Sequence, residues 1–197
     1  MAARQSNKVA IFGGCGFVGS ALTRELVTTD RFDNVFVVDD LSAGKTWLLP
    51  DDPRVQFIQG DARDIELSFL GNPDLVYYLC ADPYVPDSFR DPEHTINRNV
   101  GVLESFLKIN SESLPEHLVY VSSGEVYGSV AIGCTSESDI LKTEDLVQSS
   151  PYALSRGARR VDTQASHAER SGLGCCATAL QCGGSSFHTS LFHSRHC

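Results

Sequence analysis

The sequence predicts an α/β fold in which helices cover both faces of an open, mostly parallel, doubly wound sheet. Short apolar runs of strand length recur along the chain, as expected for strands that are buried on both faces. Segments with helical spacing of apolar residues alternate with these runs, and this alternation is typical of parallel strands joined by right-handed crossovers. The ligand crevice of such a sheet lies at the carboxyl ends of its strands.

The first strand and the turn after it carry the clearest functional signal. The apolar strand 8–12 leads into GGCGFVG at 13–19 and then into a helix. This strand, turn and helix are typical of a site for the pyrophosphate of a dinucleotide. We expect Gly13 to make the tight turn, Gly16 to let backbone N–H groups approach the phosphates, and Gly19 to let the helix pack close to the strand.

A second apolar strand, 34–38, ends in an acid. Asp39 follows Gly19 by 20 residues, the spacing at which an acid accepts hydrogen bonds from the adenosine ribose. Asp39 and the adjacent Asp40 would repel the 2′-phosphate of NADP, and no arginine follows directly in the sequence to receive one. The pattern therefore favours NAD, and the alternative is that the two acids only open a turn.

The rest of the chain continues the alternation of strands and helices. Strands are predicted at 54–60, 74–81, 118–121 and 175–180, with a helix over 99–109. Ser150 as N-cap and Pro151 at the first helical position predict a helix from Tyr152 to about Arg170. The positions at the ends of the strands should meet in one cleft: Gly13–Gly19, Asp39, Gly60–Asp61, Ala81–Asp82 and Ser122–Ser123.

Length and composition limit the function classes. A chain of 197 residues forms one ordinary domain and is too short for a nucleotide domain with a full substrate domain. A net charge of −9 argues against a nucleic-acid or anionic-membrane surface. No membrane-length apolar run or secretory signal is present, so we expect a cytoplasmic protein with a small-molecule partner. The seven cysteines suggest no disulfide framework, and the C-terminal Cys and His residues match no standard metal-site spacing.

Six motifs follow one another in a specific order: GGCGFVG at 13–19, VVDDLSAGK at 37–45, GDARD at 60–64, LCADPYVPDSFRDP at 79–92, VYVSSGEVYG at 119–128 and SPYALSR at 150–156. With them, residues 8–173 resemble the NAD-dependent sugar-nucleotide epimerases and dehydratases of the extended short-chain dehydrogenase/reductase type. The resemblance implies a Rossmann-type sheet, NAD as cofactor, a UDP-linked nucleotide-sugar substrate, and adenine contact by Asp61. The cofactor-binding residues predicted in this way are Gly13, Gly16, Phe17, Val18, Gly19, Asp39, Asp40, Asp61, Ala62, Ala81, Tyr152 and Arg156.

The resemblance also implies a catalytic set of Ser123, Tyr152 and Arg156, with Glu125 as an additional acid or base. Removing the proton of a sugar hydroxyl while hydride leaves to NAD requires a base, and a tyrosinate serves when its pKa falls far below about 10. A cation four residues along the helix favours that phenolate. The family has lysine at the position of Arg156, and the planar guanidinium reaches different oxygens. The alternatives are an interfacial tyrosine, a polar strand end and a solvated glutamate.

Two classes of function therefore stay open. One is nucleotide-sugar modification through a keto-sugar, of the UDP-sugar 4-epimerase or UDP-glucuronate decarboxylase type. Dehydration ranks behind these, because Gly124 stands where dehydratases of the family tend to place a second acid. The other is a catalytically impaired NAD-binding module or a truncated remnant of such an enzyme, for which Arg156 and the missing substrate lobe are the signs.

Composition changes near the C-terminus. All 25 acidic residues lie at or before Glu169, and the resemblance ends by about Gly174. We expect an NAD-binding domain over 1–182 and a disordered, Ser-, Gly- and His-containing tail unlike the family over 183–197. Assembly as a homodimer is compatible with this organisation.

Overall fold

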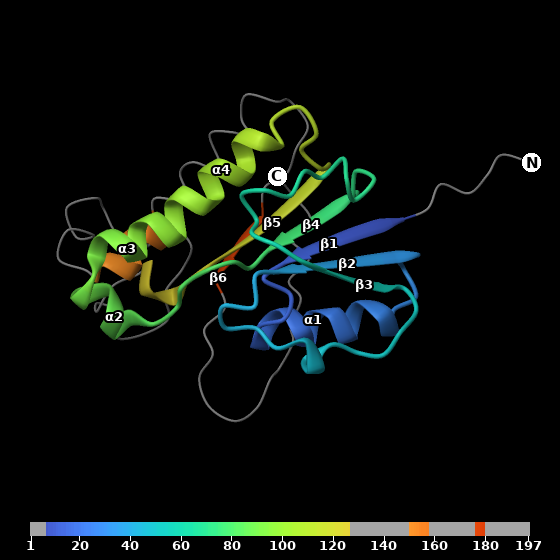
Figure 1. Ribbon diagram of the computed structural model, residues 1–197, viewed down its shortest axis with the longest axis horizontal. Helices are drawn as coiled ribbons and strands as arrows, with labels where there is room; N and C mark the ends of the chain where they lie inside the picture. The colour runs from blue at the N-terminus through green and yellow to red at the C-terminus, as the bar shows by residue number, and fades with distance from the viewer. Residues whose placement is uncertain (1–6, 127–149, 158–175, 180–197) are drawn as a thin grey trace, which may run out of the picture.

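The computed structural model describes residues 7–126 and 150–157 and the backbone of 176–179. Its six parallel strands pair in the order β3-β2-β1-β4-β5-β6 (Figure 1). The strands are β1 (Lys8–Phe12), β2 (Asn34–Asp39), β3 (Val55–Gln59), β4 (Leu75–Tyr78), β5 (His117–Ser122) and β6 (Cys176–Ala179). This order is that of the doubly wound dinucleotide-binding fold, so the predicted fold class is confirmed.

Helices cover both faces of the sheet. α1 (Phe17–Thr28) connects β1 to β2 on one face, while α2 (Val85–Arg90), α3 (Pro92–Ile96) and α4 (Val102–Ile109) connect β4 to β5 on the other (Figure 1). A π-helical turn, Asn97–Gly101, joins α3 to α4, and a 3₁₀ turn, Thr46–Leu48, follows β2. None of the helices in the described part of the chain is long and apolar enough to cross a membrane.

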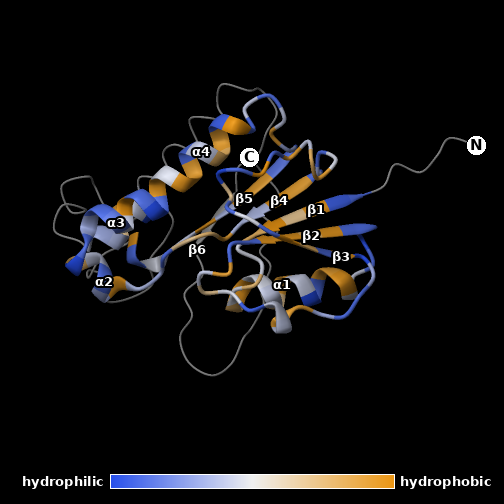
Figure 2. Ribbon diagram, in the orientation of Figure 1, coloured by the Kyte–Doolittle hydropathy of each residue, from blue (hydrophilic) through white to orange (hydrophobic). Residues whose placement is uncertain are grey.

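The core consists of two apolar layers, one on each face of the sheet. Val9 and Ile11 of β1 belong to the layer that contains Leu26 of α1. Phe12, which points to the other face, packs edge-on against Phe106 of α4 with 4.8 Å between the ring centroids. Because both faces are covered, the central strands β1 and β2 are buried and apolar along nearly their whole length, and Figure 2 shows the hydrophobic colour along much of them.

The structure differs from the predicted elements in two places. β4 ends at Tyr78, three residues before the predicted end, and the chain after it lines a pocket. Helical backbone begins well before the predicted helix 99–109, because Asp91 caps α3 by accepting a hydrogen bond from His94 N at 2.9 Å.

The helix predicted after Ser150 is present where the structure describes it. Residues 151–157 are helical, and Ala153 N donates to the Ser150 Oγ at 3.1 Å, as expected for an N-cap. The rest of this helix, up to about residue 170, and the predicted tail 183–197 lie outside the described residues.

Candidate functional site

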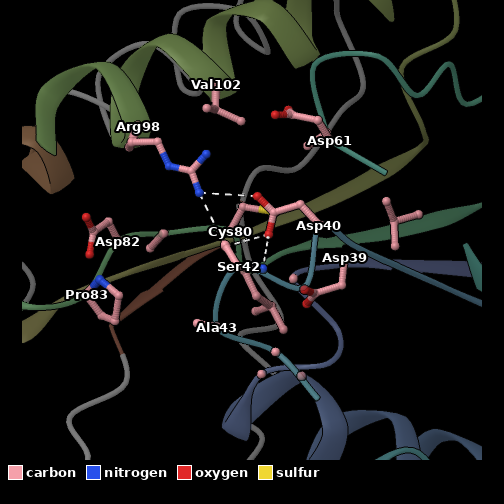
Figure 3. Close-up of a pocket in the computed structure, with 18 of the residues that line it drawn as sticks. Asp39, Asp40, Ser42, Ala43, Asp61, Cys80, Asp82, Pro83, Arg98 and Val102 are labelled. Atoms are coloured by element: carbon pink, nitrogen blue, oxygen red, sulfur yellow. Dashed lines mark hydrogen bonds and ion pairs between the residues drawn. The ribbon is translucent and has the colours of Figure 1, made fainter. Parts of the chain in front are cut away.

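A pocket of about 360 Å³ opens where the strands end (Figure 3). It is lined by the turn after β1, by residues between Asp39 and Gly44 after β2, by Gly60–Ala62 after β3, and by Leu79–Pro83 after β4. Arg98 and Val102 line it from the helical side. The pocket therefore occupies the carboxyl edge of the sheet, where doubly wound folds bind nucleotides.

The glycine turn holds β1 and α1 close together. Gly13 has a φ of +78°, a left-handed conformation that favours glycine, and its N–H donates to Val38 O at 2.8 Å. A Cβ on Gly19 would lie only 2.4 Å from Gly13 O. A glycine at position 19 is thus a condition for the close approach of the helix to the turn.

The N-terminus of α1 can receive an anion. Gly16 is its N-cap, no side-chain hydrogen bond from the described residues caps the helix, and its first turn holds no acid. The first N–H groups and the positive end of the helix dipole therefore favour a phosphate. Gly16, Phe17 and Val18 all line the pocket, so a phosphate bound there lies within it.

The two acids after β2 have different surroundings. Asp39 is 7% exposed, and its carboxylate accepts from Cys15 N at 2.9 Å and from Leu41 N at 2.8 Å. Asp40 is about one-third exposed and accepts from Ser42 N at 2.9 Å and from Arg98 Nη2 at 3.2 Å. Partial burial alone would raise the pKa of Asp40, but the hydrogen bonds from Ser42 and Arg98 outweigh it and hold that pKa below its ordinary value. Asp40 therefore presents the accessible carboxylate.

Asp61 lies at the same edge of the sheet, after β3. Arg63 grips its carboxylate with two hydrogen bonds, from Nε at 3.0 Å and from Nη2 at 2.6 Å. These contacts with Arg63 lower the pKa of Asp61, which stays an ionised acceptor at neutral pH.

A buried asparagine, which sequence analysis did not single out, supports the wall of the pocket formed after β4. The Asn99 Oδ1 accepts from Asp82 N at 2.8 Å, and its Nδ2 donates to Asp82 O at 3.2 Å and to the Ser155 Oγ at 3.1 Å. Asn99 belongs to the π-helical turn, an irregularity often found at functional sites. It thereby ties the chain after β4 to the helical segment 151–157.

The predicted residues separate into two groups. Ten of the predicted cofactor-binding residues line this pocket: Gly13, Gly16, Phe17, Val18, Gly19, Asp39, Asp40, Asp61, Ala62 and Ala81. Among the residues that the structure describes, Ser123, Glu125, Tyr152 and Arg156 lie outside its lining. The roles given to these four residues stay predictions.

Arg156 is directed into the protein. It is 3% exposed, its Nη2 donates to Val121 O, and its guanidinium carbon lies 5.0 Å from the centroid of the Tyr120 ring. Tyr152, one helical turn earlier, is 7% exposed. Ser123 Oγ accepts from Glu125 N at 3.2 Å, while the Glu125 side chain is exposed.

The strand order and the glycine turn against an uncapped helix define a Rossmann-type, dinucleotide-binding class of protein. A model of the NAD dependent epimerase/dehydratase family matches residues 9–183. The chain belongs to this family, which confirms the resemblance seen in its motifs.

Relatives of two reaction types are similar to the chain. It is 30% identical over 156 residues to the dTDP-glucose 4,6-dehydratase of Streptomyces antibioticus, and the match covers 75% of this chain and 45% of the relative. It is 28% identical over 154 residues to the UDP-glucose 4-epimerase of Lacticaseibacillus casei, covering 75% and 43%. The chain thus spans about half the length of the curated relatives it matches.

A solved structure gives the same picture. DesIV, a dTDP-glucose 4,6-dehydratase from Streptomyces venezuelae with NAD and TYD bound, superposes with a TM-score of 0.73 at 29% identity. The match covers 85% of this chain and 53% of DesIV. Epimerases and dehydratases match at similar identity, so the reaction type is left open.

Proposed function

We propose that this chain binds NAD and supplies the cofactor half of a nucleotide-sugar-modifying activity. The observation that carries the proposal is the pocket, which is lined by ten predicted cofactor-binding residues, including those at the N-terminus of α1, where no described side chain caps the helix. The residues fit a dinucleotide, because an added Cβ at Gly16 would meet one atom of the described part of the chain, Gly13 O at 3.4 Å, so the turn leaves room for a phosphate. NAD is also bound in the similar DesIV structure.

Different groups in the pocket would hold different parts of the cofactor. The N–H groups at the start of α1 would hold the pyrophosphate, Asp39 with Asp40 beside it would accept from the adenosine ribose, and Asp61 would accept from adenine. Ala81, after β4, would border the nicotinamide. NAD, when bound, supplies reversible uptake of hydride from a sugar carbinol. Tyr152 would remove the hydroxyl proton in that reaction, and Ser123 would orient the oxygen, with Glu125 as a further acid or base.

We further propose that the substrate is a UDP-linked sugar and that the reaction is 4-epimerisation or decarboxylation through a keto-sugar. The domain boundary after residue 182, assembly as a homodimer and a cytoplasmic location belong to the same proposal. Light scattering tests the dimer.

Two measurements on the full chain test the proposal. Calorimetry should show NAD binding, and turnover should be measured with UDP-glucose, UDP-glucuronate and dTDP-glucose. We expect Tyr152→Phe to abolish turnover and Arg156→Lys to raise it, because lysine restores a compact ammonium beside the tyrosine. A folded chain that binds no NAD contradicts the proposal, and unchanged turnover in Tyr152→Phe removes that residue from the mechanism.

A second candidate is a non-catalytic NAD-binding module. Its support is the placement of Arg156, whose guanidinium packs against Tyr120 and Val121 O and does not line the pocket. NAD binding without turnover of any of the three nucleotide sugars, in wild type and in Arg156→Lys, would favour this candidate.

A further inference from the structure

Arg98 reaches the pocket from a distant part of the sequence. It belongs to the π-helical turn, 58 residues beyond Asp40. Its Nη2 lies 3.2 Å from the Asp40 Oδ2 and 3.3 Å from the Ser42 Oγ, and Figure 3 shows it extended toward both. The side chains of Arg98 and Asp40 are 35% and 34% exposed, so a ligand in the pocket can touch either of them.

Asp40 and Arg98 lie where doubly wound folds bind the adenosine end of a dinucleotide. In doubly wound folds an acid after the second strand meets the 2′-hydroxyl of the adenosine ribose, whereas an arginine nearby accommodates the 2′-phosphate of NADP. Both acids accept hydrogen bonds from the chain, but Asp39 is 7% exposed and the Asp40 side chain is 34% exposed, so Asp40 is the more accessible acid. The 2′ position of a bound dinucleotide would therefore lie beside Asp40, and beside Arg98 as well.

Arg98 is suited to bind a phosphate if Asp40 does not hold it. A guanidinium donates charge-assisted hydrogen bonds to phosphate oxygens, and a partly exposed ion pair such as Asp40–Arg98 is weak enough to be exchanged. The guanidinium of Arg63 lies near the same edge, but it is paired through two nitrogens with Asp61 and does not line the pocket.

We infer that Asp40 and Arg98 together decide between NAD and NADP. Asp40 repels a 2′-phosphate and at the same time occupies the guanidinium that would receive one. This inference rests on the proposed function, since it concerns the adenosine end of the same dinucleotide site. It makes Arg98 a residue that determines specificity, and its effect becomes visible only when the charge of Asp40 is removed.

Asp40→Asn is the variant that exposes this effect. Asparagine keeps an oxygen that can accept from Ser42 N and so preserves the turn, while it loses the negative charge. We expect calorimetry to show the ratio of NADP affinity to NAD affinity raised about tenfold, the size of one charge-assisted hydrogen bond, while the affinity for NAD itself falls because the ribose loses a charged acceptor. Asp40→Ser, accepted only if its melting temperature stays near that of wild type, should give the same ratio.

Arg98→Gln in the Asp40→Asn background is the decisive step. The gain in the ratio of NADP affinity to NAD affinity should disappear in the double variant. Arg90→Gln is the matched control, because it removes the same charge from an arginine on α2 that is 79% exposed and pairs with Asp87. Combined with Asp40→Asn, Arg90→Gln should keep the gain.

Each of the following results would overturn the inference. If Asp40→Asn/Arg98→Gln binds NADP as tightly as Asp40→Asn does, Arg98 does not touch the 2′-phosphate. Loss of the gain with Arg90→Gln as well shows an effect of net charge alone. A folded wild-type chain that binds neither dinucleotide overturns the proposed function and this inference with it, whereas NAD binding without an Arg98-dependent NADP gain overturns the inference only.

Discussion

Alanine at position 19 is the most direct test of the glycine turn. An added Cβ would lie 2.4 Å from Gly13 O and 2.6 Å from Gly14 Cα, both backbone atoms that cannot rotate away. The turn or α1 must therefore move, and overpacking of this kind lowers the free energy of unfolding by about 1–3 kcal/mol. The same movement displaces the N–H groups at the start of α1, so we expect NAD affinity to fall about tenfold or more.

Alanine substitutions at two other glycines should change either NAD affinity or stability, but not both. At Gly16 the added Cβ meets one atom of the described residues, Gly13 O at 3.4 Å, so Gly16→Ala should keep the fold but lose NAD affinity because its methyl group fills the phosphate approach. At Gly101 no described atom lies within 4 Å and the backbone is helical, with φ −60° and ψ −33°. Gly101→Ala should therefore stabilise the protein by about 0.5–1 kcal/mol and leave NAD binding unchanged.

Urea unfolding followed by circular dichroism gives the stability of each variant, and calorimetry gives its affinity for NAD. The reasoning is refuted if Gly19→Ala unfolds at the urea concentration of wild type, because helix and turn would then not approach as closely as described. NAD binding by Gly16→Ala at wild-type strength would refute the place given to the pyrophosphate.

Three further predictions concern the core and the wall of the pocket. Phe106→Ala removes a ring whose centroid lies 4.8 Å from that of Phe12 and 5.1 Å from that of Tyr78. Urea unfolding should show that the free energy of unfolding falls by about 3–5 kcal/mol. Burial, with the charge of Asp39, raises the pKa of the Cys15 thiol from 9.0 to about 12, so the unfolded chain releases a proton that the folded chain keeps. Wild type should therefore lose more stability than Cys15→Ala as the pH rises from 9 to 12. An equal fall of the melting temperature in the two proteins over this pH range would contradict this. Asn99→Ala leaves the backbone of Asp82 without its partners and should cost about 1–3 kcal/mol in urea unfolding, and an unchanged midpoint would contradict it.

The sheet could be predicted from sequence because burial on both faces leaves a continuous apolar signal. In β2, for example, Val35 and Val37 belong to one layer and Phe36 and Val38 to the other, so no polar residue interrupts the strand. The glycine turn and the acids after β2 were found for a related reason, since their spacing follows from one local strand, turn and helix.

Contacts between distant segments could not be predicted in this way. Arg98 meets Asp40 across 58 residues, and Asn99 meets Ser155 across 56, so both contacts depend on how the crossovers place the helices. The direction of Arg156 is a third case. Helical spacing puts it on the same side as Tyr152, but the packing of its guanidinium on β5 decides where it points.

The position of β6 has a consequence for synthesis of the protein. β6 (Cys176–Ala179) is the last described strand to leave the ribosome, and it pairs with β5 at the edge of the sheet. Until residues 176–179 emerge, the N–H and C=O groups along one side of β5 have no partner among the described strands, although the other five described strands have been made. Such an open edge can pair with another chain. Nascent chains that stall before residue 176 should therefore aggregate through β5 and depend more on chaperones than the finished chain does.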